Sequence, residues 1–88
     1  MQGINYLQSA FAALAQTDKP IVQTDVLINL DKFLAEVKIL RRTADNKIRS
    51  QLDTLIIQIG LIKSAIRGKN YEKAKKDLDI VMKEVENI

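Results

Sequence analysis

Acidic residues are the first to consider for chemistry, because a pair of carboxyl groups can act as general acid and general base. Two such pairs lie two residues apart, Asp77 with Asp79 and Glu84 with Glu86. Residues two apart on a helix project in different directions and do not share a face. Neither pair therefore has the geometry of a catalytic dyad, and we interpret these carboxylates as solvated surface groups.

The remaining chemical signatures of an enzyme are missing. The sequence has no histidine and no cysteine, which excludes His-based catalysis, thiolate chemistry and the usual zinc sites. It also has no Walker loop, no dinucleotide-binding glycine pattern and no nucleophile elbow. We therefore expect a non-enzymatic protein with no catalytic residue, no cofactor site and no metal site.

Basic residues cluster around two turns, although the formal net charge is only +3. The first basic cluster consists of Lys38, Arg41, Arg42, Lys47 and Arg49. The second basic cluster consists of Lys63, Arg67, Lys69, Lys73, Lys75 and Lys76. Several cations at one end of a helical bundle can bind phosphates, with an affinity that falls steeply with salt. Nucleic-acid binding through the first cluster is thus one candidate function. The alternative is a solvated surface, because the clusters contain no interleaved aromatic residue for base stacking.

The elements that must position these residues are helices. Residues 48–66 carry the most regular pattern, because their apolar residues recur at alternating steps of four and three, as in a helical bundle. The residues on this seam are Ile48, Leu52, Leu55, Ile59, Ile62 and Ile66. Gly60 costs this helix about 1 kcal/mol relative to alanine, which indicates either a close backbone approach with the small Ser64 nearby or simply a weakened helix.

Three further helices are predicted around this central one. Residues 3–16 form a short helix that ends before the turn Thr17–Pro20, since proline disfavours helix at the preceding residue. A second helix is capped near residues 23–25 and buries Val26, Leu30, Phe33, Val37 and Leu40. The central helix, third in the chain, ends at Gly68, where glycine can take the left-handed conformation. Asn70 caps a last helix that starts at Tyr71.

Residues 43–46 decide the architecture, because they carry capping residues but neither glycine nor proline. With a break there, the chain is an all-α, antiparallel four-helix up-down bundle in one domain covering residues 1–88. Without a break, the alternative is three helices, one of them a long central helix that a homodimer would have to cover. We predict the four-helix bundle.

Some apolar residues fall outside the predicted seams and mark a possible interface. They are Ile28, Ala35, Ile39, Ile57, Leu61 and Ile80. Exposed apolar surface beyond a few hundred Å² commonly marks a site where a partner binds, and symmetric dimers are the commonest assembly. We therefore expect a small interaction protein, a regulator, adaptor or subunit that works through protein–protein contacts and forms a homodimer.

Composition sets the remaining limits. Hydrophobic residues make up 47% and charged residues 28% of the 88-residue chain, which is ordinary for a folded protein. No segment is apolar enough to span a bilayer and no secretory signal is recognisable, so we expect a cytoplasmic protein. In size, basicity and expected bundle form the chain is similar to bacteriocin immunity proteins, although it matches none of their motifs. That resemblance implies membrane-surface association as a further alternative.

Overall fold

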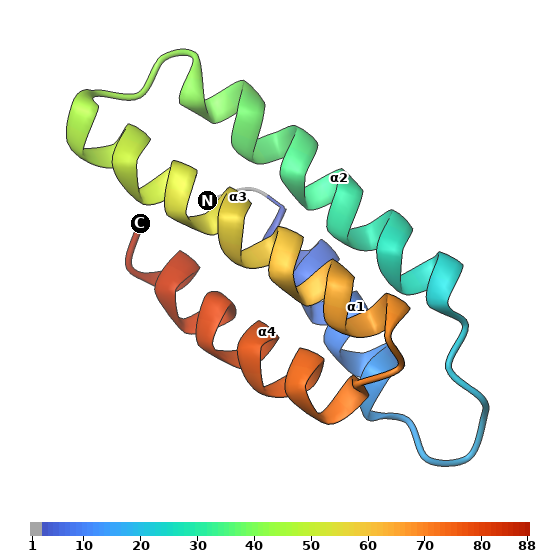
Figure 1. Cartoon of the computed structure of the whole chain (residues 1–88). Helices are drawn as coiled ribbons and strands as arrows, with labels where there is room; N and C mark the ends of the chain where they lie inside the picture. The colour runs from blue at the N-terminus through green and yellow to red at the C-terminus, as the bar shows by residue number, and fades with distance from the viewer. Residues whose placement is uncertain (1–2) are drawn as a thin grey trace.

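The computed structural model describes residues 3–88, which form four α-helices and no strand. The helices are α1 (Ile4–Ala15), α2 (Gln23–Arg41), α3 (Asn46–Arg67) and α4 (Tyr71–Glu86). They run alternately up and down in an elongated bundle of 42 × 19 × 18 Å (Figure 1). Each helix packs against two neighbours, α1 and α3 both lying between α2 and α4. The predicted antiparallel four-helix bundle is confirmed, and the alternative with one long central helix is wrong.

The core consists of one apolar cluster to which all four helices contribute. α3 supplies the most, and its seam residues from Leu52 to Ile66 are fully or almost fully buried. Ile48, at the start of the same seam, is half-buried because it lies near the open end of the bundle. Among residues 3–88 no polar or charged residue is buried, so the interior is held by apolar packing.

Leu40 departs from the prediction, because it is exposed instead of buried. The reason is the short first helix. Gly3, which precedes α1, lies against Phe33 and Glu36 of α2. Leu40 lies one turn beyond Glu36, where the described part of α1 no longer covers α2. The apolar spacing of α2 continues to Leu40, but the neighbour that would bury it does not reach that far.

The break at residues 43–46 is confirmed by the cap that begins α3. Asp45 is the N-cap residue, and its side chain accepts a hydrogen bond of 2.9 Å from the backbone N–H of Ile48. A capping carboxylate satisfies one of the N–H groups that a helix start leaves without a partner. The cap at Asp45 therefore begins a new helix, although residues 43–46 contain neither glycine nor proline.

The start of α2 differs from the predicted cap at residues 23–25. Val22 is the N-cap residue, and no side chain caps the helix. Gln23 instead reaches across the bundle, where its Nε2 donates to the carbonyl of Ile66 at 2.8 Å and to the hydroxyl of Tyr71 at 2.9 Å. These two hydrogen bonds join the first turn of α2 to the end of α3 and the start of α4.

The turn between α3 and α4 also differs in one respect from the prediction. Asn70 caps α4 as expected, accepting from the N–H of Lys73. Gly68, however, has φ −81° and is not left-handed, whereas Lys69 has φ 62°. The N–H of Asn70 bonds to the carbonyl of Ala65 at 2.8 Å and that of Lys69 to the carbonyl of Ile66 at 3.0 Å. This is the Schellman pattern, and it places the left-handed position one residue later than predicted.

Lys69→Gly should therefore stabilise the protein, since glycine avoids the roughly 1 kcal/mol that a side chain costs in the left-handed region. For a domain of this size we expect a rise in the midpoint of thermal unfolding of about 4–8 °C, measured by circular dichroism. Gly68→Ala is the matched control, because its new Cβ would lie at ordinary contact distances of 3.5 and 3.7 Å from the carbonyls of Ser64 and Ala65. A large loss of stability in Gly68→Ala, with no gain in Lys69→Gly, would contradict this turn geometry.

Candidate interaction surface on α3 and α4

The residues predicted as an interface all lie on the outside of the bundle. Ile57 and Leu61 of α3 are the most exposed large apolar residues, with 66% and 61% of their surface accessible. Ile80 of α4 and Ile28 of α2 are 44% and 45% accessible. The structure thus leaves every predicted interface residue available to a partner.

The outer face of α3 has a second property that the apolar pattern alone does not reveal. Between Lys47 and Arg67, every exposed residue of this helix is uncharged. These residues are Ser50, Gln51, Thr54, Ile57, Gly60, Leu61 and Ser64. An exposed helix face normally carries charged residues. The half-buried Asp53, one turn before Ile57, adds a carboxylate to this face, but it is paired with Arg41, so the face is suited to contact with another protein surface. The sequence already contained this property, in the residues of α3 that lie between the positions of the core seam.

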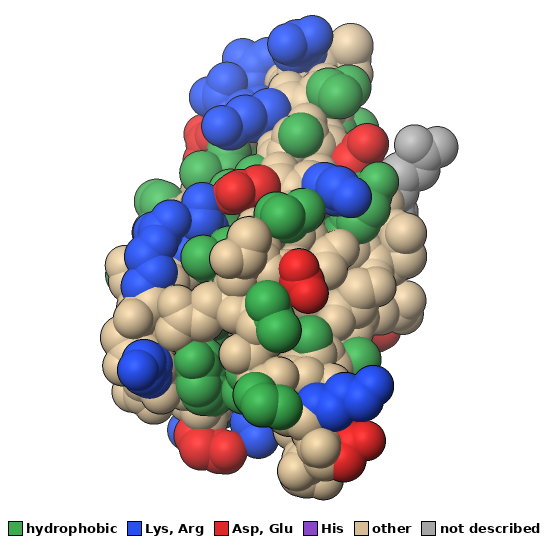
Figure 2. Space-filling model, turned by 90° about the vertical axis from the view of Figure 1, so that its right-hand side faces the viewer, with side chains coloured by type: hydrophobic (Ala, Val, Ile, Leu, Met, Phe, Trp, Pro, Cys, Tyr) green, Lys and Arg blue, Asp and Glu red, His purple; other side chains and the backbone are tan. Residues whose placement is uncertain are grey.

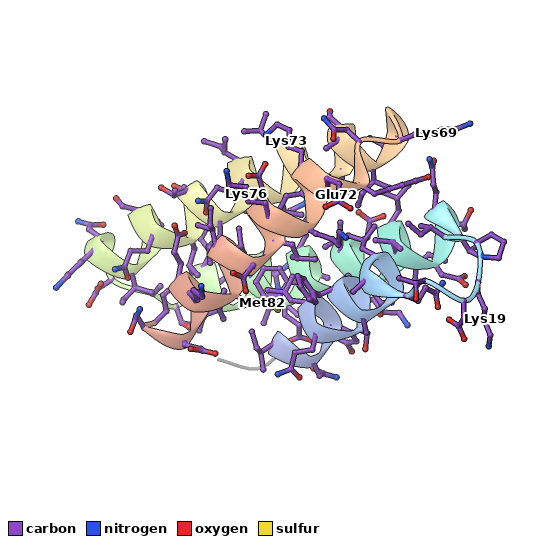
Figure 3. All side chains as sticks on the ribbon, turned by 90° about the horizontal axis from the view of Figure 1, so that it is seen from below. Lys19, Lys69, Glu72, Lys73, Lys76 and Met82 are labelled. Atoms are coloured by element: carbon purple, nitrogen blue, oxygen red, sulfur yellow. The ribbon has the colours of Figure 1, made fainter. Side chains whose placement is uncertain are left out.

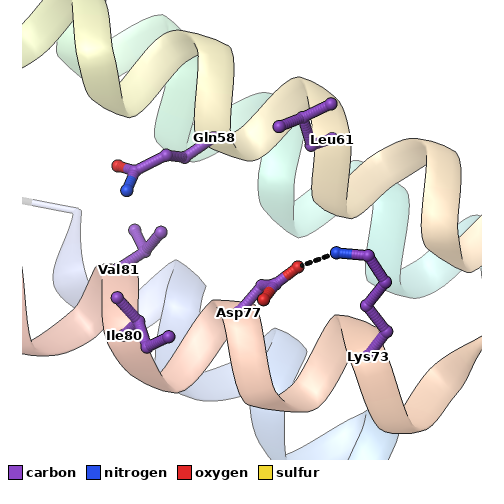
Figure 4. A pocket seen from close by; sticks show the side chains of 6 residues that line it. All are labelled: Gln58, Leu61, Lys73, Asp77, Ile80 and Val81. Carbon is purple, nitrogen blue, oxygen red and sulfur yellow. Dashed lines mark hydrogen bonds and ion pairs between the residues drawn. The ribbon is translucent and has the colours of Figure 1, made fainter.

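A groove connects this face to α4. It is lined by Gln58 and Leu61 of α3 together with Lys73, Asp77, Ile80 and Val81 of α4, and its volume is about 270 Å³. Figure 4 shows Leu61 and Ile80 on opposite helices at the groove, with the Lys73 ammonium directed at the Asp77 carboxylate. That ion pair, at 2.7 Å, lies along α4 at one end of the groove. The groove therefore joins the off-seam apolar residues of α3 to Ile80 of α4.

The third predicted stripe, Ile28, Ala35 and Ile39 on α2, does not join this groove. Two ion pairs bridge α2 and α3, Lys63 with Asp31 and Arg41 with Asp53, both at 2.6 Å. In the view of Figure 2 the hydrophobic side chains form separate spots among polar and charged groups. The sequence predicted a weaker stripe on α2, another on α3 and the single off-seam residue Ile80 on α4, and the structure brings only those of α3 and α4 together.

Gly60 does not serve the close packing within the chain that its position suggested. A Cβ built on Gly60 meets no atom within 4 Å, so no neighbouring helix requires glycine there. The helix therefore carries its least favourable residue on the open, uncharged face beside Leu61. The missing side chain of Gly60 would therefore permit a close approach only by a surface from outside this chain.

The first basic cluster gathers at the α2–α3 turn as predicted, visible as the Lys and Arg side chains at the top of Figure 2. Arg41 is engaged there by Asp53: its Nε donates to Oδ1 at 2.6 Å and its second guanidinium nitrogen to Oδ2 at 3.3 Å. This hydrogen bonding lowers the pKa of Asp53 and raises that of Arg41, and the charges of Arg41 and Arg49 act on Asp53 in the same direction.

The other members of that cluster differ in how they are held. Arg49 is half-buried and donates to the carbonyl of Ala44 at 3.5 Å. Lys38, Arg42 and Lys47 are exposed and take part in no ion pair with residues 3–88. Three cations at this end thus remain open to solvent, where the sequence had counted five.

Ion pairs also reduce the second basic cluster. Lys63, Lys73 and Lys75 pair with Asp31, Asp77 and Glu72 at 2.6–2.8 Å. Arg67, Lys69 and Lys76 take part in no ion pair within the described chain. Figure 3 shows Lys69 extending from the end of the bundle at which the loop carrying Lys19 also lies, and Lys76 farther along α4. The remaining cations are therefore spread along one side instead of forming a compact site.

Within residues 3–88, neither a metal site nor a membrane-spanning helix is present. No three His, Cys, Asp or Glu side chains lie close enough together to hold a metal ion. None of the four helices combines the length and the apolar character that a membrane-spanning segment requires. In comparison with known proteins, the chain matches no family model and resembles no curated protein and no solved structure significantly.

Asp53→Asn tests the ion pair between Arg41 and Asp53, which shifts the pKa of both side chains. Because the folded-state pKa of Asp53 lies below its ordinary value of 3.8, the ionised carboxylate stabilises the fold above that value, and this contribution disappears as the pH falls through the lowered pKa. The variant should melt at a lower temperature than the wild type at pH 7, and the two melting curves should converge toward pH 2–3. Glu86→Gln, at an exposed residue outside the ion pairs, is the control. A melting difference that persists unchanged to pH 2 would contradict this role.

Proposed function

We propose that this chain is a non-enzymatic interaction protein that forms a homodimer through the outer face of α3 and the adjoining groove on α4. The observation that carries the proposal is the exposure of Ile57 and Leu61 on a face of α3 whose exposed residues from Ser50 to Ser64 are uncharged, and whose half-buried Asp53 is paired with Arg41. The dimer would then act as a regulator, adaptor or subunit.

The apolar residues of this face set a lower limit on the size of the interface. Burying one Ile or Leu side chain fully contributes about 1.5–3 kcal/mol, whereas association costs at least about 4 kcal/mol in lost freedom. Three half-exposed apolar side chains are therefore too few by themselves, and a larger contact is needed. An interface of standard size buries roughly 800 Å² of each partner, so the contact must extend from these residues over much of the α3–α4 side of the bundle.

The absence of charge supports a second copy of the chain as the partner. In a two-fold dimer the same surface lies on both sides of the contact, so every charge near the axis meets its own copy. Like charges placed opposite each other cost several kcal/mol. The exposed residues of this strip are uncharged and Asp53 is paired with Arg41, which limits that repulsion. The missing side chain of Gly60 also permits the α3 helices to approach closely.

Light scattering coupled to a sizing column tests the dimer. We expect twice the monomer mass of 10.0 kDa at high micromolar concentration. Leu61→Asp should convert the protein to a monomer without unfolding it, since this side chain lies largely outside the core. Ile28→Asp, on the separate α2 stripe, is the matched control and should remain dimeric. A wild-type protein that is strictly monomeric at several hundred micromolar would remove the proposal.

Nucleic-acid binding at the α2–α3 turn is a second candidate function, favoured by the three exposed cations Lys38, Arg42 and Lys47. Arg41 is not part of this site, because Asp53 already engages its guanidinium group. The site predicts weak binding that falls steeply as salt is raised.

Arg42→Glu should abolish such binding in a fluorescence anisotropy titration with short single-stranded and duplex oligonucleotides. Lys76→Glu, which changes the charge equally but lies on α4, is its control and should bind like the wild type. No binding by the wild-type protein at 20 mM salt would dispose of this candidate.

A further inference from the structure

We infer that the two copies of the chain pair antiparallel about a two-fold axis that passes close to Ile80, so that Lys76 of each copy faces Glu84 of the other. The inference rests on the proposed homodimer and adds its geometry. It can fail while the dimer itself is real.

The charge along α4 is the first observation behind this arrangement. The turn before α4 and its first half carry Lys69, Lys73 and Lys76, whereas Glu84 lies near its end. Lys69 and Lys76 have no ion-pair partner among residues 3–88, and Glu84 only accepts a 3.3 Å hydrogen bond from Gln58 Nε2. The helix is thus positive toward its start and has an unpaired acid toward its end.

The other charged residues on α4 do not cancel this difference. Lys83, close to the end, pairs with Asp79 at 3.0 Å. Glu72, close to the start, pairs with Lys75 at 2.8 Å. Both are pairs within α4, so each is locally neutral. The charges on α4 that remain for a partner are those of Lys76, Glu84 and Glu86, and Glu86 adds to the negative charge at the end of the helix.

Spacing is the second observation. Lys76, Ile80 and Glu84 follow one another at four-residue steps, which places them along one side of the helix. Ile80 lies midway, about 6 Å along the axis from each charged residue at 1.5 Å per residue. An antiparallel two-fold at Ile80 brings Ile80 against its own copy and each Lys76 opposite the partner's Glu84. A parallel arrangement of the two α4 helices would instead place Lys76 against Lys76 and Glu84 against Glu84, which like-charge repulsion disfavours.

The groove gives this axis an apolar centre. Ile80 lines the groove together with Leu61 of α3, and Figure 4 shows the two side chains on either side of it. A two-fold at this level therefore brings Leu61 and Ile80 of both copies into one apolar cluster. It also turns the uncharged face of α3, including Ile57 and Gly60, toward the same face of the partner subunit.

Disulfide cross-linking tests the axis directly, because the chain has no native cysteine. Ile80→Cys should give a covalent dimer under mild oxidation, since a two-fold at this residue brings its two copies within the 4.4–6.8 Å between Cα atoms that a disulfide spans. Ile28→Cys is the control, because Ile28 is 45% accessible against 44% for Ile80 and lies on the separate stripe of α2. We expect rapid cross-linking of the Ile80→Cys protein alone.

Charge reversal tests the pairing of Lys76 with Glu84. Lys76→Glu and Glu84→Lys should each raise the dimer dissociation constant about three- to tenfold, because each change places two like-charge pairs across the interface. The double variant restores opposite charges and should return the constant to near the wild-type value, as measured by sedimentation equilibrium. Lys47→Glu, outside this stripe, should change it less than twofold.

The outcomes separate the two proposals. Equal cross-linking of the Ile80→Cys and Ile28→Cys proteins, or a double charge variant no better than the single ones, would overturn this geometry while a dimeric wild type would leave the proposed function standing. A wild-type protein that is monomeric at all concentrations would overturn both.

Discussion

The exclusion of water from one ridge of α3 is the interaction on which the rest of the structure depends. Leu52, Leu55, Ile59, Ile62 and Ile66 form this ridge. α2 and α4 both pack on α3, and α1 completes the enclosure between them. Since burial of apolar surface is favourable but non-directional, the ridge determines that the helices gather around it and leaves the details of their ends to other forces.

Those details are set by directional hydrogen bonds at the two ends of the bundle. Asp45 begins α3, Asn70 begins α4, and Gln23 ties three helices together through Ile66 and Tyr71. A hydrogen bond of this kind contributes only about 1 kcal/mol net, far less than the apolar core. Such bonds nevertheless decide where each helix starts, because a helix end leaves backbone groups that need a partner.

The candidate interaction surface lies on the same helix as the core ridge but on its opposite side. Ile57 and Leu61 point outward there because α3 carries more apolar residues than its two neighbours can cover. The uncharged exposed residues of this face and the adjoining Ile80 on α4 distinguish it from the stripe on α2. The basic clusters, in contrast, lose much of their free charge to ion pairs with acids on the same or a neighbouring helix.

The sequence by itself determined the helices, the core seams and the off-seam residues, because helical periodicity and apolar spacing are local properties that can be read along the chain. It also contained the capping residues that begin α3 and α4. Only the tertiary structure decided that Leu40 is uncovered, that Lys69 takes the left-handed position instead of Gly68, and that Asp53 engages Arg41. The tertiary structure also decided that Leu61 and Ile80 line the same groove. Each of these depends on how far a neighbouring helix extends or on which side chains meet across a turn, and distances between segments are not encoded in local spacing.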